Sequence, residues 1–369
     1  VLPLAEALHG HARAHGATRR PAVCPDHRLL GTGGSPDAPG VDVEGIQAAG
    51  FPVVPFTVND PRRMAELLDR GVRGMITDRP DLLLALLRAA DRPEWPLLTE
   101  DGRVDRELFD LQGHRGAAHL RPGNSLPSME AALDNLVTTI ETDVRLSRDG
   151  ALVLVHDARM TRSAYRPPAG GTPGQETEAA AEALTLAEIR ARFVGDVMAD
   201  APPGAGDLAP SPVATAVAAA RGLPHPHAVA TLEDLVALVR AYTRHHAARA
   251  AHDPLSALRA RNARCVHLNI EIKLGEAVRR SPRAGAPGPG AAIVRAVGRE
   301  VAALGLGGRA EVMCFDVGTT LLLQRWCPEL RPSYLFGLPP APAAPRRPAG
   351  RPPAGPRAVR GHLREARVR

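Results

Sequence analysis

The 369-residue chain is poor in aromatic residues, in cysteine and in lysine. Aromatic side chains make up only 3% of it, which argues against a stacking platform for single-stranded nucleic acid. No run of 18 apolar residues occurs, so the sequence predicts no membrane-spanning helix. The cysteines have neither a CxxC pair nor metal-ligand spacing, and we interpret them as small buried residues: Cys24, Cys265, Cys314 and Cys327.

Lysine is the scarcest charged residue, since Lys273 is the only one among 46 basic side chains. A chain that otherwise uses arginine has reason to keep a lysine where a compact ammonium is needed. The net charge of +6 is also uneven, because residues 339–369 carry eight arginines against one acid. Residues 1–338 hold 38 basic and 39 acidic side chains, so we expect no nucleic-acid partner for the folded body.

The two ends of the chain give weaker information. Residues 339–369 are rich in proline as well as arginine, so we predict that they form a disordered tail. No signal peptide is visible, and we therefore expect a cytoplasmic protein. The chain begins at Val1 rather than Met, which leaves a preceding N-terminal segment as the open alternative.

Apolar strands alternate with helices along the chain, which is typical of a parallel sheet covered by helices. Residues 1–90 predict strands at 22–24, 51–57 and 74–77 with helices at 3–15, 61–69 and 80–90. Residues 91–109 are a polar connector. Residues 110–338 predict further strands at 111–114, 138–146, 151–156, 266–272, 312–315 and 333–336, with helices between them. Within them, residues 165–230 are rich in Pro, Gly and Ala and are interpreted as an insertion with one helix near 184–192.

Two acids, Glu141 and Asp143, lie on the same face of the expected strand 138–146 because side chains alternate along a strand. Paired carboxylates repel each other unless a cation or a proton lies between them. An exposed polar strand face is the alternative, but the flanking Val137, Ile140 and Val144 indicate a buried strand. We therefore interpret the pair as metal ligands.

The next strand brings a histidine toward these acids. Asp149-Gly150 is a strong hairpin signal, and a two-residue turn there would place Asp143 opposite His156. Glu271 and Lys273 share one face of the strand 266–272, and His114 with Arg115 follow another short strand. Three carboxylates suit Mg²⁺ or Ca²⁺, and the histidines with the two cations around them predict metal-assisted cleavage of a phosphate ester.

These residues resemble the glycerophosphodiester phosphodiesterases, which are (β/α)8 barrels of the phospholipase-C-like type. The similar motifs occur in the family's order: GHRGAAHLRPGNSLPSMEAALDN, ETDVRLSRDGALVLVHD, TLEDL, IEIK and CFD. The resemblance implies His114 and His156 as the acid/base pair. It further implies one divalent cation and contacts to phosphate, with Glu141, Asp143 and Glu271 as metal ligands and Arg115 and Lys273 on the phosphate. Phe56 would form an apolar wall near the glycerol, and Asn59 would lie at the barrel mouth.

The sequence departs from the family at two places. Gly123 stands in Pro122-Gly123-Asn124 where the family often has Glu, which puts the positioning of nearby groups in doubt. Residues 51–83 resemble the end of such a barrel, with Phe56 in place of a Trp, yet they precede the HRG motif. Either the chain is a permuted barrel in which residues 1–90 complete residues 110–338, or residues 1–90 remain from an upstream barrel. A swapped dimer would satisfy both accounts.

We expect hydrolysis of glycerophosphodiesters to glycerol 3-phosphate and an alcohol. One rival is a related phospholipase-D-like enzyme that acts on lipid headgroups. Another is a catalytically defective or ligand-binding barrel, which the segment order and Gly123 favour. The intact histidines, carboxylates and lysine favour an enzyme, since a defective barrel has no need of them.

Overall fold

A computed structural model gives the fold of residues 1–17, 20–31, 41–89, 96–168, 178–198, 211–275 and 290–337. The predicted disordered tail, residues 339–369, lies outside these described residues, and so do parts of the predicted insertion at 165–230. Within the described part of the chain, every helix is too short or too polar to cross a membrane.

Parallel strands form a (β/α)8 barrel, as the sequence predicts. The sheet order is β1-β8-β7-β6-β4-β3-β2, and all of these neighbours are parallel. The strands, with β5 as an antiparallel partner of β4, are β1 (Ala22–Pro25), β2 (Gly74–Thr77), β3 (Asp110–Gly113), β4 (Thr139–Leu146), β5 (Leu152–Leu154), β6 (His267–Ile272), β7 (Ala310–Cys314) and β8 (Arg331–Phe336).

The segment 53–58 closes the ring between β1 and β2. On one side Val54 and Phe56 donate backbone hydrogen bonds to Val23 and Pro25, at 2.9 and 3.0 Å. On the other side Ile76 donates to Pro55 at 2.9 Å. Pro55 has no N–H to donate, which interrupts the pairing and explains why this predicted strand is irregular. Residues 1–90 and 110–337 therefore contribute neighbouring strands to one closed barrel.

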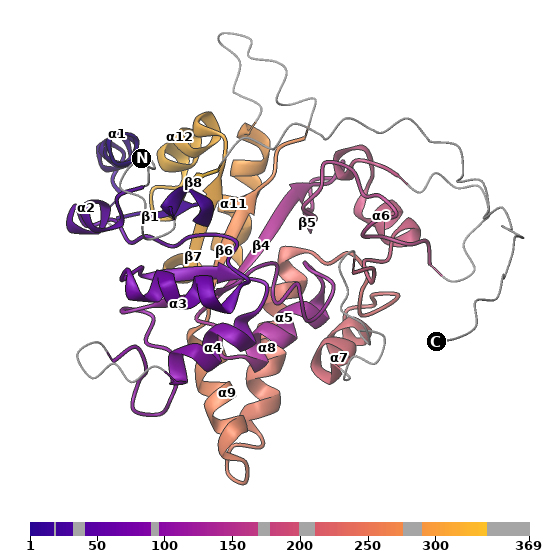
Figure 1. The fold of residues 1–369 in the computed structure, drawn as a ribbon. Coiled ribbons are helices and arrows are strands. Elements are labelled where there is room, and N and C mark those ends of the chain that lie inside the picture. The colour runs from indigo at the N-terminus through magenta and orange to yellow at the C-terminus, as the bar shows by residue number, and fades with distance from the viewer. Residues whose placement is uncertain are drawn as a thin grey trace, which may run out of the picture. The chain divides into compact units, whose positions relative to one another are not determined.

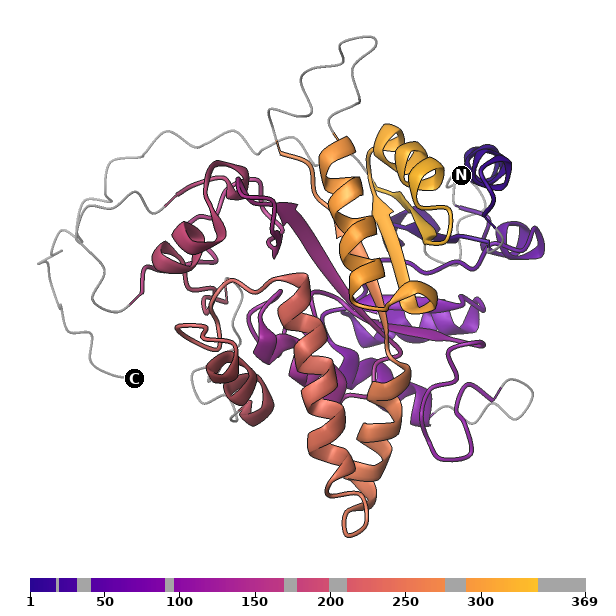
Figure 2. The same cartoon turned by 180° about the vertical axis from the view of Figure 1, so that it is seen from behind.

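Helices pack around this ring. The described helices are α1 (Leu2–Ala14), α2 (Val43–Ala48), α3 (Pro61–Asp69), α4 (Pro80–Ala89), α5 (Leu126–Asp134), α6 (Leu186–Arg192), α7 (Pro212–Ala220), α8 (Leu232–Ala247), α9 (Pro254–Cys265), α11 (Ala291–Ala303) and α12 (Val317–Trp326). Helices α3, α4 and α5 lie toward the viewer in Figure 1. Helices α11 and α12 lie toward the viewer in Figure 2, which shows the opposite side of the molecule.

Side-chain caps fix several of these helices where the sequence predicts them. Asp60 accepts hydrogen bonds from two backbone N–H groups at the start of α3, and Thr231 forms a capping box with Asp234 at the start of α8. The predicted insertion contains α7 in addition to the expected helix, because buried Glu130 accepts the N–H groups of Val213 and Ala214 at its first turn.

The described part of the polar connector, residues 96–109, contacts the end of the barrel at which β3 and β7 begin. Arg106 contacts Glu311 and lies 3.3 Å from Asp110, both inside the barrel. Thr138 and Thr139 donate to Asp110 at 2.7 and 2.6 Å. These contacts compensate buried carboxylates that would otherwise be costly.

Candidate active site

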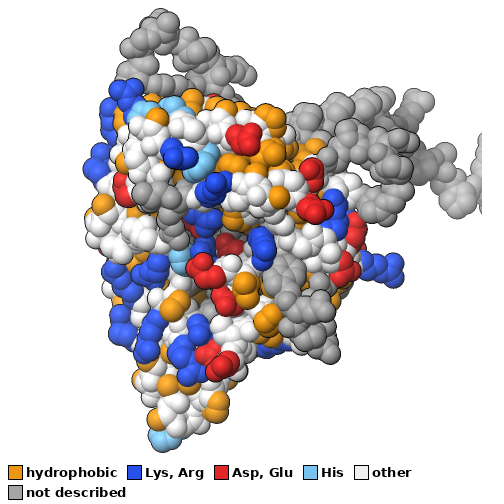
Figure 3. Space-filling model, turned by 90° about the vertical axis from the view of Figure 1, so that its left-hand side faces the viewer, with side chains coloured by type: hydrophobic (Ala, Val, Ile, Leu, Met, Phe, Trp, Pro, Cys, Tyr) orange, Lys and Arg blue, Asp and Glu red, His pale blue; other side chains and the backbone are white. Residues whose placement is uncertain are grey.

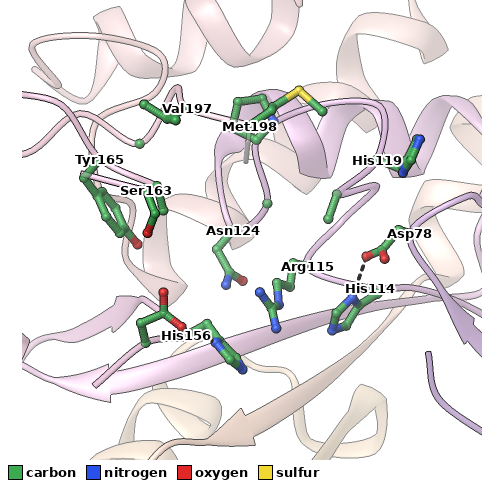
Figure 4. A pocket seen from close by; sticks show the side chains of 16 residues that line it. Asp78, His114, Arg115, His119, Asn124, His156, Ser163, Tyr165, Val197 and Met198 are labelled. Atoms are coloured by element: carbon green, nitrogen blue, oxygen red, sulfur yellow. Dashed lines mark hydrogen bonds and ion pairs between the residues drawn. The ribbon is translucent and has the colours of Figure 1, made fainter. Parts of the chain in front are cut away.

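The carboxyl ends of the strands carry a cavity of about 370 Å³, the place where barrels of this kind hold their active sites. His114 and His156 both line it, with Arg115 between them in the view of Figure 4. The opposite wall is formed by four residues of the predicted insertion, Tyr165, Gly195, Val197 and Met198, and by Ser163 and Ala164 just before it. The structure thus brings both predicted acid/base residues to one cavity.

The three predicted metal ligands form one buried cluster. Asp143 on β4 pairs directly with Glu271 on β6, and Glu141 is two residues earlier on β4. One oxygen of each carboxylate lies within 4.8 Å of the others. Glu141 and Asp143 are fully buried, and Glu271 is 6% exposed.

Two cations compensate part of this charge. Lys273 contacts Glu271 and lies 3.2 Å from Oδ1 of Asp143, while Nε of Arg115 lies 3.2 Å from its Oδ2. Burial opposes ionisation, but Lys273 and Arg115 hold the pKa of Asp143 below its usual range. Burial raises the pKa of Glu141 well above its ordinary value, and its acidic neighbours raise it further. The two cations are therefore insufficient for the whole cluster.

The cluster fits a hard divalent cation. Oε1 of Glu141 is buried and receives no hydrogen bond from any residue that the structure describes. A buried carboxylate oxygen without a donor is costly, whereas Mg²⁺ and Ca²⁺ take carboxylate oxygens as ligands. The donor set Glu141, Asp143 and Glu271 thus agrees with the predicted metal site.

The turn after β3 brings the backbone of Arg115 to the cluster. Its N–H donates to Oε2 of Glu141 at 2.7 Å, and its φ of 48° lies in the left-handed region. Gly116 follows with a φ of 86°, and a Cβ there would lie 2.6 Å from the backbone carbon of Ser128. Only glycine fits this close approach.

Asp78 holds His114, and sequence reasoning missed this residue. Its Oδ1 lies 2.5 Å from Nδ1 of His114, an interaction drawn in Figure 4. Asn59 donates to Oδ2 of Asp78 at 2.6 Å. Asp78 lies within residues 51–83, whose resemblance to the end of a family barrel was the available signal for it.

His156 has a comparable carboxylate, Asp157, whose Oδ1 lies 2.7 Å from its Nδ1. Burial lowers the pKa of His156, and the hydrogen bond to Asp157 opposes this change. Arg145 donates to the backbone oxygen of His156 at 2.9 and 3.2 Å and so fixes the segment after β5.

The predicted register of the hairpin is wrong. Leu154 pairs with Val144 rather than with Arg145, so His156 is not the direct partner of Asp143 and lies beyond the end of β5. The loop has three residues instead of two, since Ser147 donates to Ala151 across Arg148, Asp149 and Gly150. Gly150 adopts a φ of 88°, which suits the last position of such a loop.

Asn124 is a second residue that sequence reasoning missed. Its side chain donates to Asp143 and accepts from Thr142, so it orients one predicted metal ligand. The adjacent Gly123 lines the cavity, and a Cβ there would lie 3.1 Å from Cβ of Arg115. A side chain at position 123 therefore needs its neighbours to move by a few tenths of an ångström.

Phe56 does not line the cavity that holds the histidines. The ring centroids of Phe56 and Phe315 lie 5.9 Å apart in an edge-on arrangement. Nζ of Lys273 lies 5.9 Å from the ring centroid of Phe315. Phe315 also lines an apolar groove of about 420 Å³ together with Leu4 of α1. On the face of the molecule that Figure 3 shows, hydrophobic side chains gather in the upper part.

Comparison with known proteins identifies local relatives. The chain is 48% identical over 50 residues to a probable glycerophosphodiester phosphodiesterase of Mycobacterium tuberculosis, covering 14% of this chain and 18% of that protein. It is 43% identical over 53 residues to a mouse glycerophosphoinositol inositolphosphodiesterase, covering 14% of this chain and 10% of that protein. The chain thus matches less than a fifth of the length of either relative.

Solved structures of the same kind are more distant. A glycerophosphoryl diester phosphodiesterase from Silicibacter pomeroyi is 23% identical, with a TM-score of 0.44 over 65% of this chain and 69% of that one. An Oleispira antarctica phosphodiesterase, solved with the product sn-glycerol-3-phosphate, is 16% identical, with a TM-score of 0.38 over 61% of this chain and 65% of that one.

The family model gives the broadest match. The model of the glycerophosphoryl diester phosphodiesterase family matches residues 19–82 and 114–317, which together are more than half of the chain. The match includes every site residue predicted from the sequence, from Phe56 in the first part to Lys273 in the second. The chain belongs to the glycerophosphoryl diester phosphodiesterase family.

Proposed function

We propose that this protein hydrolyses glycerophosphodiesters to glycerol 3-phosphate and an alcohol with one divalent cation, Mg²⁺ or Ca²⁺. The observation that carries the proposal is the buried cluster Glu141, Asp143 and Glu271 beneath a cavity lined by His114 and His156. Acid/base groups beside a hard-cation site are the requirements of metal-assisted phosphodiester cleavage. Membership of the family supports the same reaction.

In this proposal each side chain has a defined task. Glu141, Asp143 and Glu271 hold the cation, which when bound supplies charge stabilisation at the phosphoryl oxygens. Arg115 and Lys273 bind the phosphate and compensate the charge that develops on it. These contacts also orient the phosphorus toward the attacking group.

The two histidines move the protons. One accepts a proton from the nucleophile, either water or a glycerol hydroxyl that attacks to give a cyclic phosphate, which water then opens to glycerol 3-phosphate. The other donates a proton to the leaving alkoxide, so the departing group leaves as a neutral alcohol. Burial lowers the pKa of His156, which favours the neutral form of its ring. Phe56 stays a proposed apolar wall for the glycerol moiety: it lies outside the cavity of the histidines but contacts Phe315, whose ring lies 5.9 Å from Lys273.

We also propose that residues 1–90 occupy the place that the end of the chain has in related barrels. The backbone pairing of β8 with β1, and of β2 with β3, supports this permuted order over a truncated second barrel. The cytoplasmic location and the swapped dimer stay predictions.

The test is release of glycerol 3-phosphate from glycerophosphocholine by the purified chain with Mg²⁺ or Ca²⁺. We expect turnover that EDTA abolishes, and a loss of roughly 100-fold or more in His156→Ala because an acid/base group is removed. His252→Ala, in the exposed turn between α8 and α9, is the matched control. A folded wild-type protein without turnover in either metal would contradict the proposal for this substrate.

A further inference from the structure

Asp78 faces the ring of His114 from the neighbouring strand. Asp78 directly follows β2 and His114 directly follows β3, and these strands pair in register from Gly74 with Asp110 to Thr77 with Gly113. The backbone N–H of His114 also donates to the oxygen of Thr77 at 2.9 Å. The two side chains therefore leave adjacent strand ends at the same level of the barrel, and Oδ1 of Asp78 reaches Nδ1 of His114 at 2.5 Å.

Asn59 fixes the carboxylate of Asp78 on its other side. Its amide nitrogen donates to Oδ2 of Asp78 at 2.6 Å, while its amide oxygen accepts the backbone N–H of Asp78 at 2.9 Å. The hydroxyl of Thr77 donates to the same amide oxygen at 3.2 Å. Both carboxylate oxygens of Asp78 are thus engaged, and the side chain has little freedom to turn away from His114.

The opposite nitrogen of His114 faces the reaction centre. Its Nε2 lies 4.0 Å from Oε2 of Glu141, and the ring lines the catalytic cavity with only 17% of its side chain exposed. An imidazole whose Nδ1–H is donated to a carboxylate presents Nε2 without a proton when the ring is neutral. The pair of contacts therefore selects both the tautomer and the direction of the ring.

We propose that Asp78, braced by Asn59, is a positioning residue that holds His114 in the Nδ1–H tautomer with Nε2 directed at the phosphodiester. The assignment rests on the proposed function for the chemistry that His114 performs. It also means that residues 51–78 complete the active site as well as the barrel, because Asn59 and Asp78 both belong to the segment that precedes the HRG motif.

The tautomer provides a test that does not depend on activity. In protein labelled with ¹⁵N-histidine, the ring signals of His114 are identified by their loss in His114→Gln and recorded at a pH where imidazole is neutral. We expect the Nδ1–H form in the wild type and a shift toward the Nε2–H form in Asp78→Asn, whose amide can donate to Nδ1. Asp81→Asn, which only loses the ion pair with Arg79 on the adjacent turn, should leave the signals unchanged.

Kinetics with glycerophosphocholine provide the second readout. Asp78→Asn should lower kcat by roughly 100-fold or more, because a carboxylate that fixes the tautomer of an acid/base imidazole is lost, with KM nearly unchanged. Asn59→Ala keeps the carboxylate and should lower kcat less. Because the two residues act as a unit, the double variant should be no slower than Asp78→Asn alone.

The outcomes separate this inference from the proposed function. Unchanged ring signals in Asp78→Asn, or a kcat within about twofold of wild type, would overturn the positioning role. If Asp78→Asn fails to fold by circular dichroism, Asn59→Ala decides, and a wild-type kcat in that variant would overturn the role of the brace. A wild type that lacks phosphodiesterase activity would contradict the proposed function, while the tautomer experiment would still decide the role of Asp78.

Discussion

The side-chain amide of Asn124 forms hydrogen bonds both to the carboxylate of Asp143 and to the strand that carries it. Its nitrogen donates to Oδ2 of Asp143 at 2.8 Å, and its oxygen accepts from the hydroxyl of Thr142 at 2.9 Å and from the backbone N–H of Asp143 at 3.2 Å. Asn124 adopts a φ of 59°, a conformation that asparagine tolerates better than most residues. Position 124 therefore combines a side chain that orients a predicted metal ligand with a left-handed backbone conformation.

Replacement of Asn124 should separate these two roles. Asn124→Gly and Asn124→Ala both remove the amide, so each should weaken divalent-cation binding and turnover by roughly 10-fold or more. Only the alanine variant must also place a Cβ at positive φ, which costs about 1–2 kcal/mol of unfolding free energy relative to glycine. Calorimetric metal titration and chemical denaturation measure the two effects. Asn135→Ala at the end of α5, where the side chain donates to the backbone oxygen of Ala131, is the control. Equal metal affinity in wild type and both variants would contradict the orienting role.

Glu141→Gln should make the protein insensitive to divalent cations without destabilising it in their absence. Burial and the acidic neighbours disfavour the charged form of Glu141, so a neutral side chain of the same shape relieves repulsion. The wild type should gain about 2.7 kcal/mol of stability at a cation concentration 100 times the Kd, and the variant should gain almost none.

Thermal unfolding with EDTA, Mg²⁺ and Ca²⁺ measures this difference. Glu66→Gln serves as the control, because Glu66 pairs with Arg63 on α3 and lies outside the cluster. An identical rise in Tm for wild type and Glu141→Gln would remove Glu141 from the ligand set.

Local signals account for the elements that the sequence predicts well. The helix at Pro61–Asp69 follows a capping Asp60 and has proline at its first position, and β2 at Gly74–Thr77 is a short apolar run before a helix. The predicted carboxylates follow from their alternate spacing on buried strands, since neighbouring parallel strands bring such residues to one end of a barrel.

Other features depend on contacts between distant segments. Asp78, which Asn59 braces, becomes the partner of His114 only when β2 pairs with β3, and no local pattern reports that pairing. The prediction of the hairpin register was wrong because Asp-Gly suits both a two-residue loop and a three-residue loop. The side chain of Asp149 accepts from the N–H of Leu186, a residue of the predicted insertion, and so takes part in fixing the longer form.

Because Glu300 is hard to ionise in the folded state, the free energy of unfolding should fall as the pH rises toward neutrality. Burial raises the pKa of this carboxyl on α11 from its ordinary value of 4.5 to about 7, and Glu233 and Asp234 add to the effect through their charges. The folded state therefore binds the proton more tightly than the unfolded state. This contribution to stability is complete below about pH 4.5 and is lost as the pH rises through about 7.

Glu300→Gln should consequently match the wild type near pH 5 and exceed its unfolding free energy at pH 8, by at most a few kcal/mol. Denaturant unfolding at both pH values measures the difference. Glu6→Gln, on the exposed side of α1, is the charge-matched control. A constant difference between Glu300→Gln and wild type across this range would show that Glu300 does not titrate with a raised pKa.

Gly116 and Gly150 share nearly the same φ, 86° and 88°, but differ in what surrounds them. A Cβ at Gly116 would lie 2.6 and 2.7 Å from backbone atoms of Ser128, whereas a Cβ at Gly150 would meet no described atom within 4 Å. Alanine at either position has the unfavourable left-handed backbone, about 1–2 kcal/mol. Only alanine at position 116 also forces α5 away from the turn after β3, which should add about 1–3 kcal/mol.

The same pair of variants should differ in activity. Gly116→Ala displaces Arg115, whose N–H holds Glu141, so turnover and cation affinity should fall together with stability. Gly150→Ala lies at the tip of the hairpin and should keep wild-type turnover. Denaturant unfolding and glycerol 3-phosphate release measure the two quantities. Equal destabilisation by both substitutions would mean that the close approach of Gly116 to Ser128 is relieved without cost, and the backbone conformation alone would then explain the glycine.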